Sequence, residues 1–205
     1  MSSSLAPVAA VILAYLLGSL SFAVVVSRGF GLADPRSYGS KNPGATNVLR
    51  SGNKLAALLT LLGDGGKGWL AVFLAQHYAA VYGFGSATIA AVALAVFFGH
   101  LFPVFLRFKG GKGVATAAGV LLALDIGLGL AVLGIWIGTA IVFRYSSLAA
   151  LLAAASAPLI AGMMWGFSGL VAVIGIMSMA LIGKHWQNLQ RLLAGSETKI
   201  GAKKK

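Results

Sequence analysis

Long apolar stretches separated by short polar segments are the feature that most constrains how this chain of 205 residues can fold. Hydrophobic residues make up 59% of the sequence and charged residues only 10%, whereas a soluble domain carries about 25% charged residues. The pattern predicts an all-α, polytopic membrane protein in a single domain, residues 1–205, with about seven transmembrane helices. The predicted spans are approximately 5–27, 55–82, 87–106, 113–124, 126–143, 147–165 and 168–187.

The positive charges predict the orientation of these spans. All but one of the 16 Lys and Arg residues follow the first, third or fifth span or lie in the C-terminal region, and Lys67 is the exception. Because cytoplasmic loops are enriched in Lys and Arg, we expect the N-terminus outside and the C-terminus, with its basic tail 199–205, in the cytoplasm. The same rule accounts for the net charge of +12 without a nucleic-acid partner. Residues 1–10 contain no Lys or Arg, so we do not expect a cleaved signal peptide.

The fourth span, 113–124, is the shortest of the predicted helices. Twelve residues of helix rise about 18 Å, less than the hydrocarbon core of about 30 Å. One long tilted helix over 113–143 is an alternative, but it leaves six spans and places Arg144 on the outer face. We therefore predict two short helices that turn at Asp125.

Cysteines and acidic residues are too few for several kinds of site. The chain has no cysteine, and its acidic residues are only Asp34, Asp64, Asp125 and Glu197. Clustered carboxylates hold the metals of magnesium-dependent phosphotransferases, and the three histidines are also far apart in sequence. We therefore expect neither a metal site nor a cofactor.

The polar segment 34–50 is rich in short hydrogen-bonding side chains. The Pro-Gly dipeptide at 43–44 predicts the centre of a type II turn. The small polar residues around it are Ser40, Asn42, Thr46 and Asn47. A connecting loop accounts for the turn, but this density of polar groups in an apolar chain also favours a binding segment.

A glycine-rich loop precedes the fourth span. Gly110, Gly111 and Gly113 flank Lys112, and Thr116 follows at the start of the helix. Glycines allow backbone N–H groups to approach phosphate oxygens, and a helix N-terminus favours anions. The charge of Lys112 is disfavoured there by roughly 0.3–1 kcal/mol, a penalty that a bound anion would reverse. A flexible loop with a positive-inside lysine is the alternative, but it leaves the three glycines unexplained.

The segment 64–68, Asp-Gly-Gly-Lys-Gly, lies inside the second span. Asp64 and Lys67 are three residues apart on a helix, and a pair that neutralises itself is one way to keep such charges in a membrane. The glycines suggest a different interpretation, a broken helix whose backbone lines a cavity enclosed by protein. The sequence alone leaves both interpretations open.

The end of the last span carries another group of polar residues. His185, Asn188 and Arg191 are spaced by three and therefore share one helix face. A helix end whose side chains reach toward the membrane surface accounts for Arg191, but less well for His185 and Asn188. His100, at the end of the third span, is as consistent with packing as with function.

Together these segments describe a basic site, rich in hydroxyl and amide groups, that suits a phosphate compound meeting a lipid tail. As a set they resemble the bacterial, membrane-integral acyl-phosphate:glycerol-3-phosphate acyltransferase family. Its first motif matches Gly-Ser-x-Asn-Pro-Gly-Ala-Thr-Asn at 39–47, and its second matches Gly-His at 99–100 and Gly-Gly-Lys-Gly-Val-Ala-Thr at 110–116. The third matches His, Asn, Arg, Gly, Glu and Lys within 185–199, and the family's Asp-x-x-Lys-Gly element matches 64–68.

The resemblance implies transfer of an acyl group from acyl phosphate to the 1-hydroxyl of glycerol 3-phosphate, giving lysophosphatidic acid and phosphate. The catalytic residues it implies are Ser40, Lys112, His185 and Asn188. Those around glycerol 3-phosphate are Arg50, Lys112, Ser147, His185 and Asn188. Those around the acyl-phosphate head are Ser40, Asn42, Thr46, Gly110, Gly111, Gly113 and Thr116. Those that support the site are Asp64, Lys67 and Glu197.

The resemblance also implies a place and partners for the chain. We expect a multi-pass protein of the bacterial inner membrane with its site on the cytoplasmic face. We expect the two substrates and membrane lipids as partners, without nucleic acid or an obligatory protein partner. A transporter of an anionic phosphorylated metabolite is the alternative, because broken helices and basic residues suit one. The polar segments, however, gather on one predicted face, whereas a transporter needs access from both.

Overall fold

The computed structural model describes residues 5–201, so the part of the predicted basic tail at 202–205 lies outside the described residues. Within 5–201 every regular element is a helix, which confirms the all-α prediction. The chain divides into two compact units, Met1–Asp125 and Ile126–Lys205. Each unit is described by itself below.

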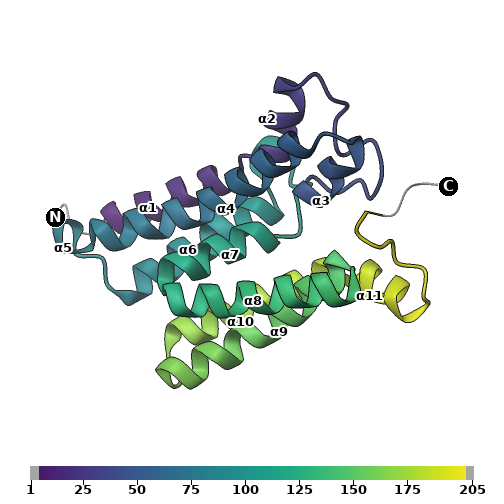
Figure 1. The fold of residues 1–205 in the computed structure, drawn as a ribbon. Coiled ribbons are helices and arrows are strands. Elements are labelled where there is room, and N and C mark those ends of the chain that lie inside the picture. The colour runs from purple at the N-terminus through teal and green to yellow at the C-terminus, as the bar shows by residue number, and fades with distance from the viewer. Residues whose placement is uncertain (1–4, 202–205) are drawn as a thin grey trace. The chain divides into compact units, whose positions relative to one another are not determined.

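The first unit is built around one long helix, α4 (Lys54–His77). It packs against α1, α2, α3, α6 and α7. Within this unit α1, α4, α6 and α7 run alongside one another, with α5 at one end and α2 and α3 at the other (Figure 1). The other elements are α1 (Leu5–Gly18), α2 (Phe22–Gly29), α3 (Ala45–Val48), η1 (Leu49–Ser51), α5 (Ala79–Tyr82), α6 (Ser86–Leu101), η2 (Val104–Leu106) and α7 (Val114–Leu124).

The glycines of α4 serve close packing rather than a break in the helix. Helix α4 continues without interruption through 64–68, so the broken-helix interpretation of that segment is wrong. A Cβ on Gly68 would lie 2.4 Å from the carbonyl oxygen of Thr116, and one on Gly119 would lie 1.9 Å from that of Gly65. Small residues thus let α4 and α7 approach backbone to backbone, as helices in membranes commonly do.

The first predicted span, 5–27, is not one straight helix. The chain leaves the helical conformation between α1 and α2, and the two helices are bent by 46° relative to each other. Ser19 donates from Oγ to the carbonyl oxygen of Tyr15 at 2.9 Å, which satisfies one carbonyl of the last turn of α1. The residues that stabilise this break come from α4 and are far away in sequence.

Over its described residues, 126–201, the second unit contains three long helices followed by a short one. Helix α9 (Ser146–Trp165) contacts α8 (Ile126–Phe143), α10 (Gly169–Lys184) and α11 (Trp186–Leu193). Helices α10 and α11 are bent by 59° where the chain passes His185 (Figure 1). The prediction placed a single span over 168–187, so the bend was missed.

The lengths of the helices bear directly on the number of spans. Among residues 5–201, four helices are long and apolar enough to cross a membrane, or up to six if each bent pair counts as one span. The remaining predicted span, the fourth at 113–124, corresponds to α7, whose 11 residues rise roughly 16 Å. Asp125 has extended dihedral angles, φ −159° and ψ 126°, so the predicted interruption between 113–124 and 126–143 is confirmed.

Candidate functional site

A buried ion pair lies at the centre of the polar residues in the first unit. Lys67 Nζ is 2.9 Å from Asp64 Oδ1, and the two side chains are only 1% and 3% exposed. The ammonium group also donates to the carbonyl oxygen of Leu20 at 2.5 Å. The self-neutralising pair that the i,i+3 spacing suggested is therefore confirmed.

His100 connects this ion pair to the glycine-rich loop 110–113. Its Nδ1 lies 3.6 Å from Asp64 Oδ1, and its carbonyl oxygen accepts from the N–H of Gly111 at 3.1 Å. Thr116, in the first turn of α7, donates from Oγ1 to the carbonyl oxygen of Asp64 at 2.9 Å. The buried pair and the loop thus belong to one hydrogen-bonded assembly.

The loop ends in a left-handed residue that starts α7. Gly113 has φ +89°, and a Cβ there would lie 2.4 Å from the ring of Phe97, so both backbone and space favour glycine. Gly111 and Gly113 are buried, whereas Lys112 and Gly110 are half-buried. As the sequence predicted, Lys112 comes directly before the start of a helix.

In the segment 34–50 the organising residue is Asn47. Its side chain is buried, accepts from the N–H of Ser40 at 3.0 Å, and donates to the carbonyl oxygens of Pro35 at 2.6 Å and Tyr38 at 3.2 Å. Ser40 is consequently fixed through its backbone while it remains exposed. Sequence reasoning noted Asn47 as a short hydrogen-bonding residue but did not include it among the site residues.

Arg50, at the end of the same segment, lies against Gly39, the residue before Ser40. Its Cδ and Nη1 lie 3.2 and 3.4 Å from the position of a Cβ on Gly39, which precedes Ser40 and has φ +57°. The first-motif residues Asn42 and Thr46 lie in the same segment, one half-buried and the other exposed.

The predicted type II turn at 43–44 is wrong. Such a turn requires a positive φ near +80° at its third residue, whereas Gly44 has φ −157°. The N–H of Gly44 donates instead to the carbonyl oxygen of Asn42 at 3.0 Å. The left-handed residues of this segment are Gly39 and Lys41, because the backbone turns around the side chain of Asn47.

An ion pair on the outside of the same segment contrasts with the buried one. Arg36 Nη2 lies 2.7 Å from Asp34 Oδ2, and the two side chains are 37% and 36% exposed. Hydrogen bonds from the Arg36 side chain, and to a lesser extent its backbone N–H and charge, hold the pKa of the Asp34 carboxyl below its ordinary value despite partial burial.

In the second unit a single carboxylate collects three side chains. Glu197 Oε1 accepts from Ser147 Oγ at 2.8 Å and from Asn188 Nδ2 at 2.6 Å, and Oε2 accepts from Arg191 Nε at 2.6 Å. Burial alone would raise the pKa of the Glu197 carboxyl. The three hydrogen bonds and the charge of Arg191 outweigh burial, so this pKa is lowered.

The backbone around Glu197 is paired with the loop between α8 and α9. The N–H of Ile200 donates to the carbonyl oxygen of Arg144 at 2.6 Å, and Arg144 Nη2 donates to that of Ile200 at 3.2 Å. Lys199 Nζ lies 5.6 Å from the ring centre of Tyr145. These contacts bring the irregular segment after α11 next to the start of α9.

His185 occupies the bend between α10 and α11. The ring is buried, with Nδ1 2.9 Å from the carbonyl oxygen of Leu181. A carbonyl oxygen can only accept, so Nδ1 carries a proton, and in the neutral ring Nε2 is an acceptor. Asn188 follows three residues later on α11 and is also buried.

The structure therefore brings the predicted site residues together in groups within each unit. In the first unit one group contains Asp64, Lys67, Gly110, Gly111, Gly113 and Thr116 with Lys112 in the loop, and another contains Ser40, Asn42, Thr46 and Arg50. In the second unit a hydrogen-bonded group contains Ser147, Asn188 and Glu197, and His185 lies three residues before Asn188 at the α10–α11 bend. His100 and Asn47 hold the first two groups together, although the sequence indicated both only as motif residues and not as site residues.

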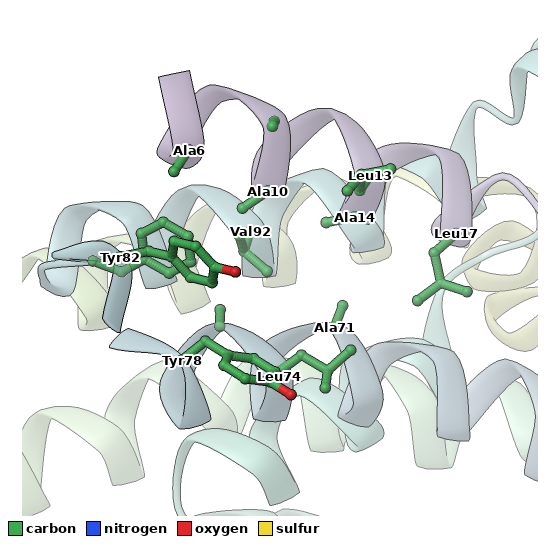
Figure 2. Close-up of a pocket in the computed structure, with 13 residues that line it drawn as sticks. Ala6, Ala10, Leu13, Ala14, Leu17, Ala71, Leu74, Tyr78, Tyr82 and Val92 are labelled. Atoms are coloured by element: carbon green, nitrogen blue, oxygen red, sulfur yellow. The ribbon is translucent and has the colours of Figure 1, made fainter. Parts of the chain in front are cut away.

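An apolar cavity of the first unit lies away from these residues. It has a volume of about 380 Å³ and is enclosed by α1, α4 and the residues around α5 (Figure 2). Its lining is apolar except for the tyrosine hydroxyls, and it includes none of the predicted site residues. The lining residues are Ala6, Ala9, Ala10, Leu13, Ala14, Leu17, Ala71, Leu74, Ala75, Tyr78, Tyr82, Phe84 and Val92.

Residues that could hold a metal ion do not cluster in the part of the chain that the structure describes. No group of three or more His, Cys, Asp or Glu side chains with that arrangement occurs within 5–201. The carboxylates of both polar clusters are instead paired with cations and amides.

Comparison with known proteins identifies the class of fold first. The chain is similar to the crystal structure of PlsY (YgiH), an integral membrane glycerol 3-phosphate acyltransferase, in its glycerol 3-phosphate form. The TM-score is 0.89 with 36% identity over 96% of both chains. The lysophosphatidic acid form of the same protein is similar with a TM-score of 0.87 and 35% identity. The fold is thus that of an all-helical, multi-pass integral membrane protein.

The sequence comparisons then identify the family. Residues 8–195 match the family described as Glycerol-3-phosphate acyltransferase. The chain is 66% identical to the glycerol-3-phosphate acyltransferase of Dechloromonas aromatica (strain RCB), over 96% of this chain and 97% of that protein. It is 60% identical to that of Ralstonia pickettii (strain 12J), over 100% and 99%. The chain belongs to the glycerol-3-phosphate acyltransferase family, which confirms the resemblance inferred from the motifs.

Proposed function

We propose that this chain transfers an acyl group from acyl phosphate to the 1-hydroxyl of glycerol 3-phosphate, giving lysophosphatidic acid and inorganic phosphate. Membership of the family supports the reaction, and one relative solved in glycerol 3-phosphate and lysophosphatidic acid forms supports the acceptor and the product. The observation that carries the proposal is the loop 110–113, whose glycines and Lys112 directly precede α7. Backbone N–H groups, a lysine and a helix N-terminus together suit a phosphate group.

The loop 110–113 holds the phosphate of the acyl donor in this proposal. Asn42 and Thr46 contribute amide and hydroxyl groups, while Lys112 neutralises negative charge on the phosphate. Thr116, whose hydroxyl donates to the carbonyl oxygen of Asp64, holds the start of α7 beside the loop. Ser40, whose backbone is fixed by Asn47, donates a hydrogen bond to the phosphate or to the oxyanion. The buried Asp64–Lys67 pair supports the loop through its contact with His100.

The motif resemblance assigns glycerol 3-phosphate to Arg50, Lys112, Ser147, His185 and Asn188, and we keep that assignment. Arg50 and Lys112 pair with its phosphate, because an arginine fork and a lysine charge both suit phosphate oxygens. The hydroxyl of Ser147 donates its hydrogen bond to Glu197. Toward the substrate, its oxygen therefore accepts a hydrogen bond from a glycerol hydroxyl. Nε2 of neutral His185 accepts in the same way, since Nδ1 faces Leu181. Glu197 keeps Ser147 and Asn188 oriented.

The transfer is direct and proceeds without an acyl-enzyme. The 1-oxygen of glycerol forms a bond to the acyl carbonyl carbon, and the bond from that carbon to the phosphate oxygen breaks. The proton of the attacking hydroxyl passes to an oxygen of the departing phosphate, which lies next to the attacked carbon. The donor thus supplies both leaving group and base, and we expect no metal, cofactor or obligatory protein partner.

The chain acts as one integral membrane acyltransferase domain, residues 1–205, with seven spans in the bacterial inner membrane. The distribution of Lys and Arg supports an external N-terminus and a site on the cytoplasmic face. Because the chain has no cysteine, single cysteines at Ser40 and Ser196 should react with a membrane-impermeant maleimide only from the cytoplasmic side, and one at Gly85 only from outside. Labelling of Ser40→Cys from outside would overturn this orientation.

A product assay separates the enzyme from a transporter. Purified protein in detergent, given acyl phosphate and glycerol 3-phosphate, should form lysophosphatidic acid and release phosphate in equal amounts. A transporter would form neither product, yet would accumulate the phosphate compound in sealed vesicles. Uptake without product formation would contradict the proposed function.

A further inference from the structure

The buried polar cluster of the first unit contains side chains from two helices and lies beside two irregular segments, the α1–α2 break and the glycine-rich loop 110–113. Asp64 and Lys67 lie in the interior of α4, His100 lies near the end of α6, and the glycine-rich loop precedes α7. All three side chains are buried, with His100 7% exposed. Burying charged groups costs desolvation free energy, so we expect the contacts of this cluster to have a role besides packing.

At the first of these places the ion pair caps both sides of the α1–α2 break. Lys67 Nζ donates to the carbonyl oxygen of Leu20, just after the end of α1. Asp64 Oδ1 accepts from the N–H of Phe22, the first residue of α2, at 3.4 Å. Helix ends leave backbone groups without partners, and a cation at a C-terminus and an anion at an N-terminus are both favourable. The pair therefore fixes the α1–α2 break to α4.

At the second place the loop 110–113 packs directly against His100. A Cβ on Gly111 would lie 2.2 Å from His100 Nε2, and one on Gly110 would lie 2.2 Å from the carbonyl oxygen of His100. The N–H of Gly111 donates to that same carbonyl oxygen. The loop thus rests on the ring and on the backbone of one residue, whose other ring nitrogen faces Asp64.

We propose that His100 is a positioning residue for the glycine-rich loop, with the Asp64–Lys67 pair holding its ring against Gly111. This inference rests on the proposed function, because it assigns the loop a phosphate to bind. His100 does not touch the substrate. It fixes the path of the backbone whose N–H groups meet the phosphate, and a displacement of about 1 Å in such groups can cost up to 100-fold in rate.

Two substitutions separate the parts of this arrangement. His100→Asn keeps a polar atom near the position of Nδ1 and removes the ring edge that faces Gly111. His100→Phe keeps the ring and removes the nitrogen that faces Asp64. The matched control is His77→Asn, because His77 lies exposed at the end of α4, stacked on Phe73 and outside the cluster.

The measurements are kcat, KM for both substrates, inhibition by inorganic phosphate and the thermal unfolding midpoint in detergent. We expect His100→Asn to unfold close to the wild-type temperature, and to raise KM for acyl phosphate and the inhibition constant of phosphate about tenfold or more. His77→Asn should match the wild type. If His100→Asn lowers only kcat and the unfolding midpoint, His100 is merely a packed residue and the proposal fails.

A second test uses the contact between His100 and Gly111. Gly111→Ala should raise the inhibition constant of phosphate strongly in the wild-type background and much less in the His100→Asn background. The reason is that His100→Asn removes the ring that the new Cβ would meet. If Gly111→Ala raised the inhibition constant of phosphate by the same factor in both backgrounds, the proposal would be overturned. Wild-type protein without acyltransferase activity would instead contradict the proposed function, so the two failures are distinguishable.

Discussion

The polar clusters of the two units each contain one carboxylate that accepts from several donors, but they differ in burial. Asp64 and Lys67 are 3% and 1% exposed in the interior of α4. Glu197 and Arg191 are 8% and 41% exposed, and Glu197 lies in an irregular segment after α11. The first cluster caps helix ends within a packed bundle, whereas the second orders a segment that has little packing of its own. We therefore expect loss of a charge from the buried Asp64–Lys67 pair to affect folding, and changes in the second cluster to affect local order.

The largest effect is expected for Lys67→Met. It leaves the carboxylate of Asp64 buried without its nearest cation, and breaking a buried pair costs about 3–5 kcal/mol. The unfolding free energy in detergent, or the yield of folded protein, should fall accordingly. The double variant Asp64→Asn with Lys67→Met should be less unstable than Lys67→Met alone. A double variant that is worse than the single one would show that the pair does not act as a unit.

Lys112→Ala should reduce activity without a comparable loss of stability. Lys112 is only half-buried and is proposed to neutralise phosphate, so removal of its charge-assisted hydrogen bonds should cost about 1.5–3 kcal/mol in kcat/KM, or roughly 10- to 100-fold. Lys54→Ala, at the exposed start of α4, serves as the matched control and should retain full activity. Equal behaviour of the two variants would make Lys112 an ordinary positive-inside residue.

Glu197→Gln should have an intermediate effect that depends on pH. Loss of the charge weakens hydrogen bonds from Asn188, Arg191 and Ser147, by about 1–2 kcal/mol in total near neutral pH. Because the pKa of Glu197 is lowered in the fold, its stabilisation is present above the unfolded value of about 4.3 and is lost as pH falls through the lowered value. Thermal unfolding of wild type and variant should therefore converge in acid. A difference that persists at the lowest pH would contradict the carboxylate's role.

The smallest effect is expected for Arg36→Met, the counterpart of Lys67→Met at the exposed pair. Surface ion pairs contribute about 0–1 kcal/mol, and Asp34 and Arg36 are each more than a third exposed. The unfolding midpoint should shift only slightly, and less still at high salt. A loss as large as that of Lys67→Met would show that burial does not set the difference between the two pairs.

The sequence predicted the features that depend on local patterns. Apolar runs located the helices, the i,i+3 spacing predicted the Asp64–Lys67 pair, and the glycines with Lys112 predicted a loop before α7. It missed the α1–α2 break, because the residues that cap that break are about 45 positions away on α4. The contact between Ser147 and Glu197 spans 50 positions and was likewise invisible, although the motif resemblance had assigned Glu197 a supporting role.

The turn at 43–44 shows the limit of dipeptide rules. Pro-Gly favours a type II turn in isolation, but here Asn47 binds the backbone at Pro35, Tyr38 and Ser40 and selects another path. His100 illustrates the same limit for site residues. Its relation to Gly111 arises from the packing of α6 against the loop, which no spacing rule describes.

The most direct test of the central claim is a single turnover with acyl phosphate that carries one label on the acyl chain and another on the phosphate. We predict that labelled phosphate and labelled lysophosphatidic acid appear together, in equal amounts, only after glycerol 3-phosphate is added, and that the protein never carries the acyl label. Release of phosphate before glycerol 3-phosphate is present, with the acyl label trapped on Ser40, would contradict direct transfer.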